Sequence, residues 1–169
     1  MLLNRRWTEE VHTVAGIAPI AAIMATQTSI YVNMSLWKKC VFTLFTGVGT
    51  TGTATLTVNA ATSAAGANAV AIPFTYRSYA TELTTDVPTT VPTLATSAGF
   101  TTTAGSNGLY VLEVDAANLN SITPIAGSPY KYVSMTLTNV VSSNVIGGVL
   151  IQLSNPAYQG ALAPTTVIV

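Results

Sequence analysis

Only 7% of the 169 residues are charged, and six basic residues balance six acidic ones, whereas soluble domains usually carry about 25% charged residues. This balance gives no basic footprint for nucleic acid and no polybasic run for anionic lipid. Hydrophobic residues make up 49% of the chain, and a net charge of zero does little to keep free monomers apart. We therefore expect an assembly subunit without enzymatic activity or cofactor.

Residues 1–35 differ in composition from the rest of the chain. Charged residues cluster over residues 5–10, where a short helix is expected, and an apolar run interrupted by Pro19 follows over residues 14–25. This run is shorter than the about 20 residues of a membrane span, and Ile23 occupies a position where a signal-peptide cleavage site requires a small residue. We predict an extended N-terminal arm that docks on another subunit, followed by a first strand near residues 30–32.

Apolar and hydroxyl-bearing residues alternate from residue 38 onward, which is typical of strands with one buried face. The alternation is clearest over residues 40–45, 53–59 and 133–138. Further strands are predicted at residues 70–76, 110–114 and 145–153, the last with an apolar run over 149–151 that indicates burial on both faces. Residues 84–105 are expected to form a long surface loop.

Short strands, frequent turn residues and the lack of long amphipathic helices favour an all-β fold. We predict an antiparallel β-sandwich, or a jelly-roll-like variant of it, over residues 36–155. Residues 156–169 are expected to form a C-terminal tail whose end is apolar. The single cysteine, Cys40, cannot form an intrachain disulfide, so folding in a reducing cytoplasm is expected.

One segment matches a nucleotide-binding pattern. Residues 47–52 read Gly-Val-Gly-Thr-Thr-Gly and follow a predicted strand. A dinucleotide site requires a helix next, so that the pyrophosphate meets the helix N-terminus. A threonine-rich strand follows instead, so we interpret the segment as a glycine-rich hairpin loop.

Catalytic and metal-binding groups are scarce. His12 is the only histidine, and it lies in the predicted arm rather than on a core strand. Glu113 and Asp115 are two residues apart on a predicted strand and therefore share a face. Such a pair can serve a glycosidase or bind calcium, but we favour a strand end that either faces solvent or forms an ion pair, with Lys131 or Arg77 as candidate partners. No metal site is predicted.

Candidate interface residues come from the arm, from two aromatic clusters and from the apolar tail, because aromatic residues and arginine are enriched at protein interfaces. The candidates are Arg5, Arg6, Trp7, Ile17, Ile20, Ile23, Tyr76, Arg77, Tyr79, Val167 and Ile168.

Three stretches carry a resemblance to a known group of proteins. They are the opening Asn4-Arg5-Arg6-Trp7-Thr8-Glu9-Glu10, the strand–loop–strand segment 42–58 with its Gly- and Thr-rich turn, and the strand pair 130–156. Together they resemble the head decoration, or cement, proteins of tailed bacteriophages. The resemblance implies a β-sandwich or β-tulip domain, often trimeric, that sits on the lattice of the major capsid protein and strengthens it. It implies no catalytic residue.

The expected location is thus the capsid surface of a virion, after synthesis in the host cytoplasm. Three alternatives remain open at this point. The first is another virion component, such as a head fibre base, a tail protein, or a minor or shell capsid protein. The second is a secreted β-sandwich that binds carbohydrate or another ligand, for which an aromatic platform would be needed. The third is a hydrolase that uses Glu113 and Asp115.

Overall fold

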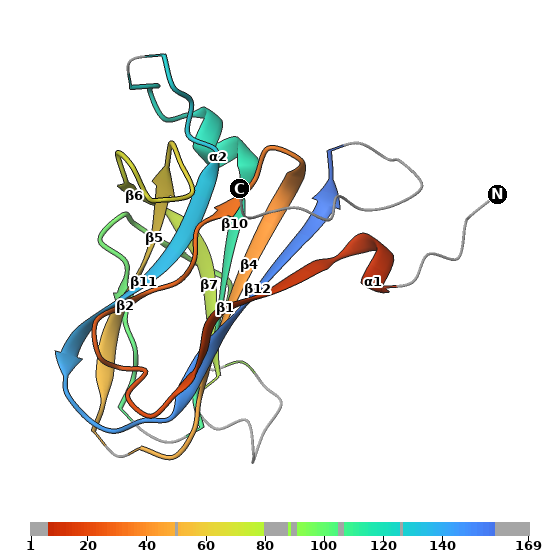
Figure 1. Ribbon diagram of the computed structural model, residues 1–169. Helices are drawn as coiled ribbons and strands as arrows, with labels where there is room; N and C mark the ends of the chain where they lie inside the picture. The colour runs from red at the N-terminus through yellow and green to blue at the C-terminus, as the bar shows by residue number, and fades with distance from the viewer. Residues whose placement is uncertain are drawn as a thin grey trace.

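Two antiparallel β-sheets pack face to face in the computed structural model, which describes residues 7–49, 51–79, 88, 91–104, 107–125 and 127–157 (Figure 1). This arrangement confirms the predicted all-β sandwich.

The first sheet, which we call sheet A, has six strands. Their spatial order is β1 (His12–Ile20), β12 (Gly147–Pro156), β4 (Trp37–Thr46), β10 (Leu109–Asp115), β7 (Phe74–Tyr79) and β8 (Thr93–Ala95). The second sheet, sheet B, has the order β2 (Gln27–Thr28), β11 (Tyr132–Val141), β5 (Thr53–Ala61) and β6 (Val70–Ile72). In addition, β3 (Val32–Asn33) pairs with β11, and β9 (Phe100–Thr101) pairs with β5.

Two short helices complete the described chain. Helix α1 (Trp7–Glu10) precedes β1, and helix α2 (Ala116–Asn120) follows β10. The long loop predicted over residues 84–105 contains the two short strands β8 and β9. The predicted tail begins at Pro156, which is the last residue of β12, and its residues 158–169 lie outside the described part of the chain.

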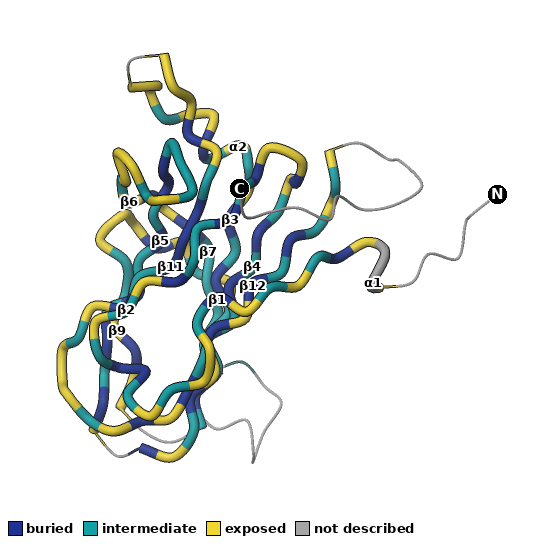
Figure 2. The backbone as a smooth tube through the Cα atoms, in the orientation of Figure 1, coloured by how far each residue is buried: buried dark blue, intermediate teal, exposed yellow. Residues whose placement is uncertain are grey.

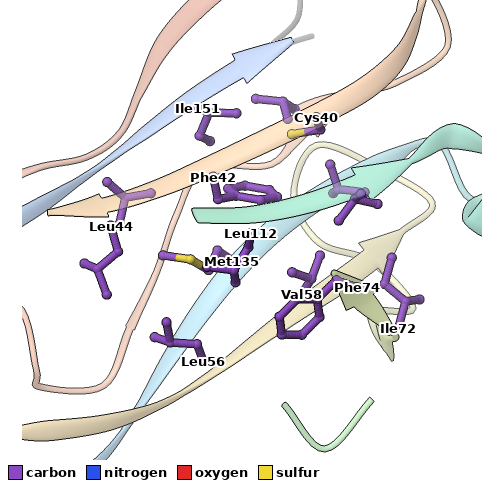
Figure 3. Close-up of a cluster of buried hydrophobic side chains, with 14 of the residues drawn as sticks. Cys40, Phe42, Leu44, Leu56, Val58, Ile72, Phe74, Leu112, Met135 and Ile151 are labelled. Atoms are coloured by element: carbon purple, nitrogen blue, oxygen red, sulfur yellow. The ribbon is translucent and has the colours of Figure 1, made fainter. Parts of the chain in front are cut away.

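The core lies between the two sheets and follows the predicted alternation. Phe42 and Leu44 of sheet A meet Val58 and Met135 of sheet B, and all four side chains are inaccessible to solvent (Figure 3). Buried and more exposed residues alternate along β4 and β12 in Figure 2. Each sheet therefore presents one face to the core and one to the outside.

The prediction of an N-terminal arm is wrong for residues 12–35, which belong to the sandwich itself. Strand β1 pairs with β12 in register His12 with Leu153. The backbone of β1 lies close to its neighbour, because a Cβ at Gly16 would lie 2.8 Å from Cγ1 of Ile151. Pro19 lies in this edge strand. A proline is tolerated there because its missing N–H interrupts no hydrogen bond between paired strands. The boundary drawn at residue 35 therefore separates no arm from the domain.

The glycine-rich segment 47–52 is not a hairpin loop, because it connects two different sheets. It leaves β4 of sheet A and enters β5 of sheet B, and no helix follows it. Its glycines allow tight packing on the chain before β12, since a Cβ at Gly52 would lie 2.8 Å from Cγ2 of Val145. The described residues that follow this segment therefore form a strand, where a dinucleotide site requires a helix.

Candidate assembly surface

The outer face of sheet A is apolar toward one end of its strands and charged toward the other. Strand register places Ala15, Leu150, Thr43, Val111 and Arg77 in one row across five strands. Solvent reaches residues on this face in every strand of the sheet. Leu150 is 41% exposed, so the prediction that residues 149–151 are buried on both faces is wrong. The apolar run of β12 instead contributes one large side chain to the outside.

A second row of the same face is still more apolar. The register continues from Gly148 through Phe45 and Leu109 to Tyr79. Phe45 is 62% exposed although its ring is one of the largest apolar groups in the chain. Monomeric proteins seldom expose contiguous large apolar groups, so this row is a candidate interaction surface.

A groove of about 320 Å³ runs along this surface between β1, β12 and β4. Its lining contains no charged residue among those described: Ala15, Ile17, Pro19, Thr43, Phe45, Gly148, Val149 and Leu150. The register between β1 and β12 shifts between Ala15 and Ile17 and again between Ile17 and Ile20. The wall of the groove that β1 contributes is therefore built from an irregular part of the edge strand.

Exposed apolar side chains continue from the groove onto one end of the sandwich. Val48 and Ile146 are 75% and 61% exposed. Their loops lie side by side, because the backbone N–H of Gly47 donates to the carbonyl of Ile146 over 2.6 Å. We call this region, defined by Phe45, Val48, Ile146 and Leu150, the apolar end.

Most described charges lie at the opposite end, which we call the charged end. The register places Lys39 opposite Asp115, far along the strands from Phe45. The charged end carries Glu10, Lys38, Lys39, Glu113, Asp115 and Lys131. Arg77 is the exception among the described charges, since it lies in the same row as Val111. The molecule is therefore polarised along its strands.

The outer face of sheet B is polar and hydrogen-bonded to itself. The hydroxyl oxygens of Thr28 and Thr136 are 3.1 Å apart, and Nδ2 of Asn59 donates to Oγ1 of Thr136 over 2.9 Å. Thr55 and Thr101 make a similar contact of 3.0 Å. These hydroxyls have hydrogen-bond partners and are also accessible to solvent. Burial of the outer face of sheet B would therefore release less free energy than burial of the outer face of sheet A.

Glu113 and Asp115 share the outer face of β10, as predicted, but the ion-pair partner is neither Lys131 nor Arg77. Nζ of Lys39 donates to Oε2 of Glu113 over 3.1 Å. The hydrogen bond and the charge of Glu113 raise the pKa of Lys39 above its ordinary value of 10.5, and Asp115 adds to this. Lys39 is the partner because the register between β4 and β10 places it beside Glu113.

We predict that Glu113→Gln lowers the free energy of unfolding by at most about 1 kcal/mol at neutral pH, because the pair is partly exposed. The folded-state pKa of Lys39 is raised, so this stabilisation is complete below the unfolded-state pKa and is lost as pH rises through the folded-state value. Urea titrations of the wild type and the variant should therefore converge at alkaline pH. A double-mutant cycle with Lys39→Met isolates the pair, and a difference that persists at alkaline pH would contradict its assignment.

The predicted interface residues separate into five groups. Ile17 lines the groove, and Arg77 and Tyr79 lie on the outer face of sheet A. Trp7 is 66% exposed at the charged end. Ile20 is partly buried against the core. Arg5, Arg6, Val167 and Ile168 lie outside the described residues.

The last group contains Ile23, which is wrong as an interface candidate because it is fully buried, and Tyr76, which is partly buried against the core. Ile23 is inaccessible to solvent, and its backbone N–H donates to the carbonyl of Val145 over 2.9 Å. Tyr76 packs against the core, where its ring stacks on Phe100 with 3.7 Å between centroids. Sequence reasoning missed the exposure of Phe45. The signal was present, because Phe45 alternates with the buried residues Phe42 and Leu44 in the same phase as Val41 and Thr43.

Groups that could support catalysis or metal binding are poorly placed. Burial of Cys40 raises the pKa of its thiol and removes it from solvent. The ring of His12 lies 6.2 Å from that of Trp37. Within the described residues, no group of three or more His, Cys, Asp or Glu side chains could hold a metal ion. The described part of the chain also contains no helix long and apolar enough to span a membrane.

The fold and this surface define the chain as a β-sandwich in which the outer face of one sheet is apolar at one end and charged at the other. No protein-family model and no curated protein matches its sequence. Among solved structures, it is similar to the crystal structure of the SPBc2 prophage-derived protein YomS, with 12% identity and a TM-score of 0.46 over 86% of this chain and 94% of that one. A likeness of this size carries no argument about function.

Proposed function

We propose that this protein is a structural assembly subunit that works by burying the outer face of sheet A against neighbouring subunits. The observation that carries the proposal is the apolar surface formed by the groove, Phe45 and Leu150, which is bordered on the same sheet face by Arg77 and Glu113. Burial of apolar area yields about 25 cal/mol per Å². A repeated contact of this kind adds up over a lattice through avidity.

The edges of sheet A are poor sites for continuing the sheet into another subunit. Strand β1 carries Pro19 and two register irregularities, and β8 is only three residues long. Short, bulged or proline-bearing edges prevent the pairing of strands from different molecules. This favours packing through the face of the sheet.

The neighbours that we propose are the major capsid protein of a tailed bacteriophage and further copies of this chain, with a trimer as the preferred oligomer. The support for the capsid and for the trimer is the resemblance of residues 4–10, 42–58 and 130–156 to head decoration proteins. Two observations support a non-enzymatic role. The thiol of Cys40 is buried, and the carboxylate of Glu113 is already paired with Lys39. Another virion component would use the same surface and is the alternative.

Replacing Phe45 and Leu150 by Asp should weaken self-association and binding to particles by at least about 100-fold, because two charges would be placed in an apolar interface. Sedimentation velocity of the purified protein and co-sedimentation with particles that lack it provide the measurement. Thr138→Asp is the matched control, since this exposed residue lies on the outer face of sheet B. Equal effects of both changes would contradict the assignment of sheet A.

The capsid location is tested separately. Mass spectrometry of purified particles of the virus that encodes the chain should find it at a copy number proportional to the capsid protein. Cryo-electron microscopy of these particles should then show sheet A facing the lattice or a neighbouring copy. Absence of the chain from the particles would refute the virion role.

A further inference from the structure

The groove of sheet A is a poor site for water. Thr43 provides the only polar side chain among the described residues that line this space of about 320 Å³. An ordered water needs about two to four polar partners. Phe45 and Leu150, which border the same space, are 62% and 41% exposed. The groove therefore favours an apolar, uncharged occupant.

The free subunit also needs such an occupant before it assembles. Its formal net charge is zero, and 49% of its residues are hydrophobic. Charge repulsion therefore does little to keep two free copies apart. An exposed apolar groove on such a molecule favours premature association. A segment that covers the groove in the free subunit would limit this association.

The chain that follows β12 has the composition of such a cover. Residues 157–169 contain no charged side chain, and residues 167–169 read Val-Ile-Val. β-branched side chains pack well on the pleated surface of a sheet. Gly160 stands near the start of the segment and is a residue type common in turns. The sequence thus allows a change of direction well before the apolar residues.

The point at which this segment leaves the domain lies within reach of the groove. The backbone N–H of Ala157 donates to the carbonyl of Leu36 over 2.8 Å, which holds the chain at the charged end. From Pro156 back to Leu150 along β12 the distance is about 20 Å, at about 3.4 Å per residue. Residues 158–168 span up to about 36 Å when extended. The same chain is therefore long enough to turn back over its own groove.

Docking within one chain is favoured over docking on a second copy. The attachment at Ala157 makes the contact intramolecular, and a short linker gives an effective concentration of about millimolar. Free subunits at lower concentration cannot compete with this. A second copy matches it only after assembly, when the surface of the neighbour itself is available to fill the groove.

We propose that residues 161–169 cover the groove of their own chain in the free subunit, with Val167 and Ile168 against Phe45 and Leu150. A neighbouring subunit displaces them when it buries the outer face of sheet A. This inference rests on the proposed function, because it assigns a regulator to the same surface. The segment thereby lowers the affinity of free subunits for one another and for the lattice.

Disulfide cross-linking of the full chain tests the location of this segment. The double variant Leu150→Cys, Ile168→Cys places one thiol beside the groove and one in the segment. Native Cys40 does not interfere, because it is buried. Under a mild oxidant, a disulfide within the monomer should form at least about tenfold faster than in a control, because docking raises the effective concentration of the thiols. If circular dichroism shows that the change at the groove disturbs folding, Thr43→Cys replaces it.

The control is the double variant Thr138→Cys, Ile168→Cys. Thr138 is exposed on the outer face of sheet B, and it lies as far along β11 from Tyr132 as Leu150 lies along β12 from Pro156. Non-reducing electrophoresis separates cross-linked monomers from dimers. Equal rates in the two variants overturn the proposal. A predominance of linked dimers also overturns it, because the groove would then hold the segment of a second copy.

Binding to particles measures the displacement. Val167→Ser combined with Ile168→Ser should raise the affinity of the free chain for particles that lack it by about fivefold, which corresponds to a groove covered in about four of five free subunits. Thr165→Ser combined with Thr166→Ser is the matched control and should leave the affinity unchanged. A lower affinity of the first variant would show that the segment itself contacts the neighbour, and it would overturn the proposal.

The two proposals fail on different measurements. Equal cross-linking in both cysteine variants refutes the covered groove, and it does not affect the burial of sheet A that Phe45→Asp with Leu150→Asp tests. Unchanged particle binding by that aspartate variant refutes the assembly surface, whereas the cross-link still reports where the segment lies.

Discussion

A chain that lacks residues 1–25 should fail to fold, although composition alone suggests that these residues form a separable arm. The deletion removes β1, which pairs along β12, and it removes Ile23 and Met24 from the core. Loss of one buried side chain of this size costs about 2–5 kcal/mol. Two such losses, together with a missing strand, match the whole stability of about 5–15 kcal/mol that a domain has.

Circular dichroism and thermal unfolding of the truncated chain provide the measurement. We expect no cooperative transition. A shorter deletion, of residues 1–10, is the control, because it removes α1 and leaves β1 intact. That chain should unfold cooperatively with a melting temperature close to that of the full protein. A cooperative transition in the longer deletion would restore the interpretation of an independent arm.

The strands with regular alternation could be predicted from the sequence, and those without it could not. Strands β4, β5 and β11 repeat apolar and hydroxyl residues over their length, and their positions were anticipated closely. Strand β1 could not be predicted because its register with β12 shifts twice. These shifts break the alternation of buried and exposed residues by which a strand is identified in a sequence. Strands β2 and β3 are two residues long, which is too short for any period to be visible.

The pairing of strands that are distant in the sequence also could not be predicted. Nothing in residues 47–52 indicates that the chain leaves one sheet and enters the other, because both outcomes need the same turn residues. The partner of Glu113 is fixed by the pairing of β10 with β4, which brings Lys39 beside it. The candidate surface depends on the same pairing, since only the register places Phe45 in line with Leu109 and Tyr79.

Two glycines with the same backbone conformation should respond differently to replacement by alanine. Gly99 and Gly127 have φ values of +76° and +77°. An alanine at either position pays the cost of the left-handed region, about 1–2 kcal/mol. At Gly127 nothing lies within 4 Å of the added Cβ, so no further cost is expected. At Gly99 the Cβ would run into the backbone carbonyl oxygen of Leu56 and lie 2.8 Å from Cγ2 of Thr57.

This clash cannot be relieved by a side-chain rotation, because the carbonyl belongs to β5 in the middle of sheet B. Gly99→Ala should therefore lose about 3 kcal/mol or more, since overpacking adds to the backbone strain. In a chain of this length that corresponds to a fall in melting temperature of about 6–12 °C. Differential scanning calorimetry of both variants measures the difference directly. The two positions share the same backbone strain, so any difference between the variants comes from the contact of Gly99 with β5. Equal losses of unfolding free energy in both variants would show that the turn before β9 can move away from β5 without loss of stability. The contact between them would then not hold the edge of sheet B in place.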